Sequence, residues 1–140
     1  MVEFALVVGA FLLVTFAAVS AAFHSIQRAM AETAAAAGVQ VAASGTPGSP
    51  SVPYLSGAFR PTDDLLKSVM FGTAIVQVPA GQQCPQAVPD ATIDVCVYPD
   101  GNLVAETIRG HPAFPVPLIT QWLPWSIDVT VEMHAVSYQP

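Results

Sequence analysis

Few side chains in this sequence have the types and spacing that catalysis or metal binding requires. The three histidines, His24, His111 and His134, lie far apart, and no Asp or Glu stands beside them at the spacing of a metal-binding motif. A zinc-type site needs three or four such ligands. Metal binding would therefore depend on the fold alone, and surface or interface histidines are the simpler interpretation.

Two pairs of carboxylates are close enough in sequence for acid–base chemistry. Asp63 and Asp64 are better explained as the first turn of a helix, where the helix dipole favours negative charge. Asp128 and Glu132 fit the solvated face of a strand. The sequence also lacks a glycine-rich phosphate loop and a Gly-x-Ser-x-Gly elbow. We therefore predict no enzyme, no cofactor and no metal site.

The two cysteines, Cys84 and Cys96, are the remaining reactive side chains. Their spacing matches neither a CxxC redox motif nor a metal site. Two lone thiols in an exported domain more often form one disulfide than remain free. We predict a Cys84–Cys96 disulfide, with Cys84 in a loop and Cys96 in a strand.

Glu3 precedes twenty residues, 4–23, that carry no charge. As a helix this run is about 30 Å long, the thickness of the hydrocarbon core of a bilayer. A cleaved secretory signal is the competing interpretation. It is disfavoured because the segment before the run has no Lys or Arg, and because the run exceeds the usual length of a signal's apolar region. The run is a candidate transmembrane helix.

The helical pattern continues beyond this run, because residues 24–44 are rich in alanine and lack proline. Arg28 and Glu32 are spaced to form an ion pair on one turn of this helix. Residues of small or apolar type recur every three or four positions, which predicts a stripe that packs on a core. The members of this stripe are Ile26, Met30, Ala34, Ala37 and Val41.

Residues 44–53 contain three prolines and two glycines and should end the helix in a loop. Residues 61–72 predict a short helix with Thr62 as its cap. Its core face would hold Leu65, Leu66, Val69 and Met70. Alternation then predicts strands at 73–78, 91–98 and 126–138, with 102–108 a weaker fourth, and a hairpin turn at 98–102.

The expected fold class is therefore α+β. A long helix over residues 1–44, apolar in its first half, packs on an antiparallel sheet of three or four strands in a head over residues 45–140. The last strand alternates, so one set of its residues would face the core and the other would face water. The expected core set is Ile127, Val129, Val131, Met133 and Ala135, and the expected wet set is Asp128, Thr130, Glu132 and His134.

The charge balance limits the partners of this chain. Ten acidic and four scattered basic residues give a net charge of −6. Nucleic-acid binding and polybasic binding to anionic lipid both need clustered Lys and Arg, so neither is expected. Trp122 and Trp125 lie in an apolar, proline-rich stretch, where they could form a membrane-interface belt, a protein contact or part of the core.

The N-terminal segment Val-Glu-Phe-Ala-Leu-Val-Val, residues 2–8, followed by a long apolar helix, resembles the start of the TadE-like proteins. These are pilin-like subunits of tight-adherence pili, within the broader type IV pilin superfamily. The resemblance is weaker at the C-terminal end, where a proline-rich apolar stretch precedes a final strand, and residues 45–90 show none. Many TadE-like chains have a proline after this segment, where Gly9 stands here.

The resemblance implies a pilin-like fold, a prepilin peptidase and secretion machinery as partners, and storage in the membrane before assembly. The glutamate of the family is usually the fifth residue of the mature chain, whereas here it is the third. Either the mature N-terminus lies upstream or processing differs. The residues expected to carry helix-to-helix assembly are Glu3, Phe4, Leu6, Gly9, Leu12, Leu13 and Phe16.

Three functions follow as hypotheses. The leading one is a homo-oligomeric structural subunit of an extracellular pilus-like filament, held by one span in the cell membrane before assembly. The second is a minor pilin-like protein that primes or tips a filament of another subunit. The third is a single-pass, membrane-anchored surface binding module.

Overall fold

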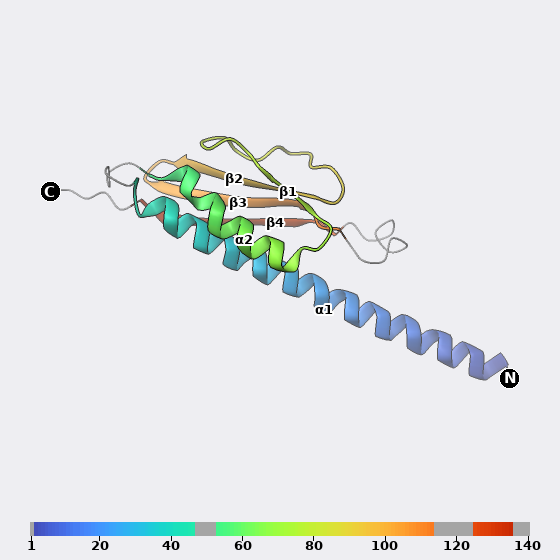
Figure 1. Cartoon of the computed structure of the whole chain (residues 1–140). Coiled ribbons are helices and arrows are strands. Elements are labelled where there is room, and N and C mark those ends of the chain that lie inside the picture. The colour runs from blue at the N-terminus through green and yellow to red at the C-terminus, as the bar shows by residue number, and fades with distance from the viewer. Residues whose placement is uncertain (1, 47–52, 114–124, 136–140) are drawn as a thin grey trace.

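The computed structural model describes residues 2–46, 53–113 and 125–135. A helix of 42 residues, α1 (Val2–Ala43), runs along one side of a small head and projects far beyond it (Figure 1). The head adds a 3₁₀ helix η1 (Leu55–Ala58), a helix α2 (Phe59–Val69) and four strands. The strands are β1 (Ala74–Gln77), β2 (Thr92–Asp100), β3 (Leu103–His111) and β4 (Ile127–His134).

The single long helix expected from the sequence is confirmed. Its 42 residues correspond to a rod about 63 Å long, with no proline to interrupt it. The helix ends at Ala43, where the Ser44 amide donates to the Gln40 carbonyl at 3.1 Å. Gly45 follows with φ of 90°, a left-handed conformation that commonly terminates helices.

The four strands form one sheet in the order β1-β2-β3-β4. The expected hairpin joins β2 to β3, with Asp100 paired to Leu103 and Gly101 at φ of 61° in the turn. The expected all-antiparallel sheet is wrong, because β1 pairs with β2 in parallel. Residues 78–91 carry the chain back along the sheet, so that β2 starts at the same end as β1.

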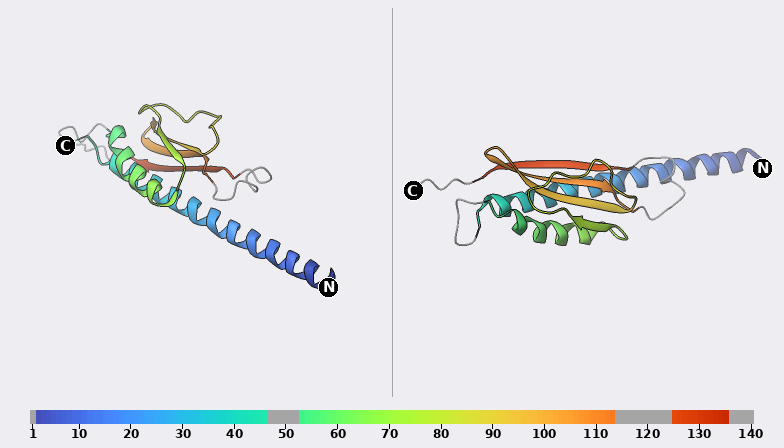
Figure 2. Two further views of the ribbon diagram at one scale, coloured as in Figure 1. Left: turned by 45° about the vertical axis from the view of Figure 1, so that its right-hand side comes forward. Right: turned by 90° about the horizontal axis from the view of Figure 1, so that it is seen from above.

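The sheet and the helices form two layers. The second half of α1 and α2 lie side by side on one face of the sheet (Figure 2). The 102–108 strand, expected to be the weakest, is the inner strand β3 and is buried along most of its length. In β4, Ile127 and Val129 face the core and Asp128 and Thr130 face water, as expected, whereas Met133, also expected on the core face, is exposed.

The face of α1 that is buried in the structure is rotated about the helix axis relative to the expected stripe. Ile26 is largely exposed, and of the expected stripe only Ala34 is fully buried. Gln27, which is not part of this stripe, is buried. The buried face consists mainly of small residues, which let the sheet and α2 approach the helix axis closely. These residues are Ala31, Ala34, Ala35, Gly38, Val39, Ala42 and Ala43.

Helix α2 differs from its prediction at its start. It continues directly from η1 and begins at Phe59, so Thr62 is not its cap and Asp63 and Asp64 lie beyond its first turn. The start of α2 is therefore not a free helix end that a side chain could cap. The expected core residues Leu66 and Met70 are buried, and Leu65 packs partly against them.

Candidate functional site

The first half of α1 is the largest exposed apolar surface in the described part of the chain. Every residue from Glu3 to Val19 is exposed, and Ser20 is the first buried one. Phe4 is 75% exposed and Leu13 is 73% exposed. Figure 1 shows this half leaving the head as a free rod. Because such a surface is costly in water, it requires lipid or protein around it.

All the residues expected to carry assembly lie on this rod. Phe4, Leu6, Leu12, Leu13 and Phe16 are exposed, and they are spread over rather more than half of the circumference of the helix. Gly9 has open space where a side chain would be. Glu3 lies in the first turn of α1, at the free end of the rod.

Within the described residues, α1 is the one helix long and apolar enough to cross a membrane. Its apolar window is almost entirely outside the head, unlike the core helix of a soluble protein. The structure thus provides a single candidate span near the N-terminus.

The rod meets the head at an aromatic contact. The Trp125 ring, just before β4, lies 4.7 Å from the His24 ring on α1, at an angle of 60°. The Trp125 carbonyl oxygen is 3.2 Å from His111 Nδ1 at the end of β3. Trp125 therefore packs against the point where α1 leaves the head, whereas Trp122 lies outside the described residues.

Cys84 and Cys96 form a disulfide in the structure, with their Cα atoms 5.4 Å apart. Cys96 is buried in β2, and Cys84 belongs to the connection over residues 78–91. The connection is also held by the Gly81 amide, which donates to the Val97 carbonyl at 2.8 Å. The disulfide thus fixes this long connection against the sheet.

A buried carboxyl group lies where α1, α2 and the sheet meet. Glu106 on β3 is 0% exposed, and its Oε1 is 2.5 Å from the Thr62 hydroxyl on α2. Its Oε2 has no hydrogen-bond partner among the described residues. Both groups face Gly38 on α1, where an added Cβ would overlap the carboxylate and the hydroxyl. Three elements therefore contact one another through this cluster.

Burial raises the pKa of Glu106 from 4.5 to about 8, against the opposing effect of the Thr62 hydrogen bond. The carboxyl is therefore protonated at neutral pH. The Thr62 hydroxyl donates to Glu106 Oε1, and it also lies 3.0 Å from the Ala58 carbonyl oxygen.

Glu106 is not among the residues predicted from the sequence. The alternation of residues 103–111 could have indicated this residue, because it places Glu106 on the same face of the strand as Val104 and Ile108. A carboxylate between two β-branched residues on a core face is unusual and must be neutral or paired.

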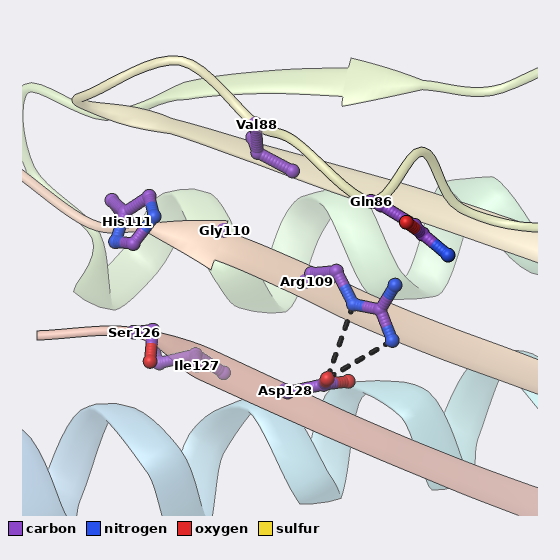
Figure 3. A pocket seen from close by; sticks show the side chains of 8 residues that line it. All are labelled: Gln86, Val88, Arg109, Gly110, His111, Ser126, Ile127 and Asp128. Atoms are coloured by element: carbon purple, nitrogen blue, oxygen red, sulfur yellow. Dashed lines mark hydrogen bonds and ion pairs between the residues drawn. The ribbon is translucent and has the colours of Figure 1, made fainter.

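A shallow polar groove of about 390 Å³ lies at the end of the sheet where β3 ends and β4 begins (Figure 3). Its floor carries an ion pair between Arg109 Nη2 and Asp128 Oδ2 at 3.0 Å. Gln86 and Val88 from the 78–91 connection line the other side. The ion pair occupies the charged groups, and the described residues contain no cluster of three metal-ligating side chains.

Helix α1 forms an ion pair between Arg28 and Glu32 at 3.3 Å, as expected from their spacing, and α2 forms one between Lys67 and Asp63. Both pairs are exposed and contribute little to stability. Both pairs lie on the part of the helices that belongs to the head, beyond the rod.

The chain matches no protein-family model, no curated protein and no solved structure.

Proposed function

We propose that this protein is a structural subunit of an extracellular pilus-like filament, held in the cell membrane by α1 before assembly. The observation that carries the proposal is the 42-residue helix whose first half is apolar on every face and exposed, while its second half is built into a folded head. The likeness of residues 2–8 to the start of TadE-like proteins supports the same proposal.

The energetics of the rod favour a bundle of copies once the helix leaves the bilayer. Full burial of one Leu or Phe side chain contributes about 1.5–3 kcal/mol. Phe4, Leu6, Phe11, Leu12 and Leu13 are each at least 60% exposed. Together they supply on the order of 10 kcal/mol if neighbouring helices cover them. The rods would form the filament core and the heads its outer layer.

The shape of the subunit favours an open assembly over a closed one. Because the rod is apolar on every face, one face of a rod can pack against a different face of its neighbour, which is a heterologous contact. Such contacts, repeated about a screw axis, give a filament. Ala5, Gly9 and Ala17 are small residues that permit close approach between rods.

The test is to shear filaments from cells that make this protein, image them and identify their subunit by mass spectrometry. The expected result is that the chain is the repeating protein. Filaments that lack the chain but disappear on its deletion would favour the minor pilin-like role. Filaments that are unaffected by deletion would leave the membrane-anchored binding module.

A cysteine placed at Leu13 probes the core directly, because both native cysteines are joined in a disulfide. Oxidation of intact filaments should give disulfide-linked dimers of the subunit, because each chain carries one added thiol. The same variant dispersed in detergent is the control and should remain monomeric. A monomer in both samples would contradict the helical bundle.

A further inference from the structure

Phe71 is the most exposed large apolar side chain of the head within the described residues, at 77%. It lies in the corner between α2 and β1, where the Thr73 amide donates to the Met70 carbonyl at 3.3 Å and Gly72 has φ of 73°. The corner is fixed to the end of β3, because the Ala113 amide donates to the Thr73 hydroxyl at 2.8 Å. The fold therefore holds an aromatic ring outward in a defined position.

The position of this corner along α1 follows from helix geometry. Helix α2 runs antiparallel to α1 (Figure 1), and Thr62 Oγ1 lies 3.2 Å from the Ala34 carbonyl oxygen. From Thr62 to Met70 the chain rises about 12 Å, and the same rise back along α1 from Ala34 reaches Ile26. Phe71 is thus level with Ile26, which is itself 54% exposed.

This level coincides with the end of the candidate span. Residues 4–23 fill the hydrocarbon core, and the polar interfacial layer extends about 5–8 Å further on each side. Ile26 lies about 4–5 Å beyond residue 23, within that layer. The Trp125 ring packs against His24 at nearly the same level. Aromatic side chains favour this layer of a bilayer.

The charges of the neighbouring helices lie above this level. Residues 68–78 contain no charged side chain, while Lys67 and Asp63 pair on the preceding turns of α2. The nearest charge on α1 beyond the span, that of Arg28, lies about 3 Å further from the bilayer than Ile26. The corner itself therefore carries no charge into the interfacial layer. The exposed Asp90 is the charge beside it, because the Ala74 amide donates to the Ala91 carbonyl at 2.8 Å, and the polar interfacial layer can solvate this carboxylate.

We propose that the α2–β1 corner docks into the interfacial layer of the bilayer that α1 spans, with Phe71 as its anchor. The head then rests on the membrane in one orientation before assembly. This inference rests on the membrane stage of the proposed function. A lipid surface fits better than a second copy, because Phe71 and Ile26 are separate exposed side chains at one depth, and no other large apolar side chain of the described residues is exposed between them.

The experiment uses the full chain in phosphatidylcholine nanodiscs, with p-benzoylphenylalanine placed at one position at a time. The positions are Phe71, Leu13 within the span and Asn102 at the far end of the head. After irradiation, mass spectrometry should find phospholipid adducts at positions 71 and 13 and none at 102. An adduct at 13 without one at 71, or a cross-link from 71 to a second copy alone, overturns this inference and leaves the span standing.

Absence of lipid adducts at Leu13 would instead overturn the membrane stage itself, and the docking with it.

A second measurement avoids the bulky probe. Phe71→Ser should raise hydrogen exchange of the amides of residues 69–73 in nanodiscs several-fold, while Val76→Ser, at a side chain 45% exposed on β1, should leave it unchanged. Equal exchange in wild type and Phe71→Ser would also overturn the docking.

Discussion

The Thr62 hydroxyl of α2 lies 2.5 Å from the Glu106 carboxyl oxygen of β3, in a space kept open by Gly38 of α1. This contact joins the two helices to the inner part of the sheet. Burial holds the carboxyl protonated, so the contact is a hydrogen bond between neutral groups. The attachment of α1 to the head therefore depends on a proton.

The stability of the head should fall as pH rises from about 4.5 to about 8. In this window the unfolded chain ionises Glu106 while the folded chain keeps it protonated, so the folded state binds more protons and loses stability by up to ~1.4 kcal/mol per pH unit. Above pH 8 the contribution of Glu106 becomes constant. Urea denaturation of the detergent-solubilised chain at several pH values measures this slope.

Glu106→Gln keeps the shape of the protonated side chain and removes its titration. The variant should lose this part of the pH dependence and be more stable than wild type at pH 8. Glu132→Gln, on the exposed end of β4, is the matched control and should keep the wild-type slope. An unchanged slope in Glu106→Gln would show that Glu106 ionises normally in the folded state.

Gly38→Ala should destabilise the head by about 1–3 kcal/mol, as overpacking of a core does. The new Cβ would overlap Glu106 and Thr62, and neither side chain can move into solvent because both are buried. The ~1 kcal/mol that alanine gains over glycine in a helix offsets only part of the overpacking cost. Thermal unfolding provides the measurement.

Gly9→Ala is the matched helix-glycine control, because nothing lies within 4 Å of its new Cβ. It should leave the melting temperature unchanged or raise it slightly. Glu106→Ala combined with Gly38→Ala should cost less than the sum of the single changes, since the first makes room for the second. Strict additivity would contradict the overlap.

Loss of the Cys84–Cys96 disulfide should destabilise the head by about 3 kcal/mol. The cysteines are 12 residues apart, and closing a loop of this size restricts the unfolded chain by that amount. The double Cys→Ala variant and reduced wild type should both show the loss in urea denaturation. Reductant should have no effect on the double variant, and an effect there would point to another cause.

Glu3→Gln and Glu3→Ala should leave membrane insertion intact and reduce surface filaments at least tenfold. A carboxylate inside a helix bundle needs a cation, and an N-terminal ammonium, of its own chain or of a neighbour, is the nearest suitable one. Quantitative immunoblots of sheared and membrane fractions separate the two effects. Glu32→Gln, at an exposed pair above the rod, should assemble normally. Wild-type filament yield from the Glu3 variants would refute this pairing.

The sequence predicted the elements better than their packing. The long helix, the hairpin at Gly101 and the two faces of β4 follow from local periodicity and turn chemistry. The packed face of α1 does not, because alanines surround the second half of the helix and give little contrast between its sides. The direction of β1 depends on the path of residues 78–91, which local patterns do not encode.

The candidate site shows the same contrast between local features, which the sequence predicts, and tertiary contacts, which it does not. The exposed rod follows from an uncharged run too long for a signal and too apolar for a surface helix. Thr62 was expected to cap α2 because local rules cannot show that η1 runs into α2 without a break. Its partner Glu106 is 44 residues away, so their contact arises only in the folded chain.

The unbroken path of α1 from Val2 to Ala43 has a mechanical consequence. The described chain has no hinge between rod and head, so tension on a head passes along the helix axis as a shear load on the face around Gly38. Small side chains alone would offer little resistance to sliding. The Glu106 and Thr62 side chains fill the space beside Gly38, so they oppose sliding of α1 along its axis relative to the head.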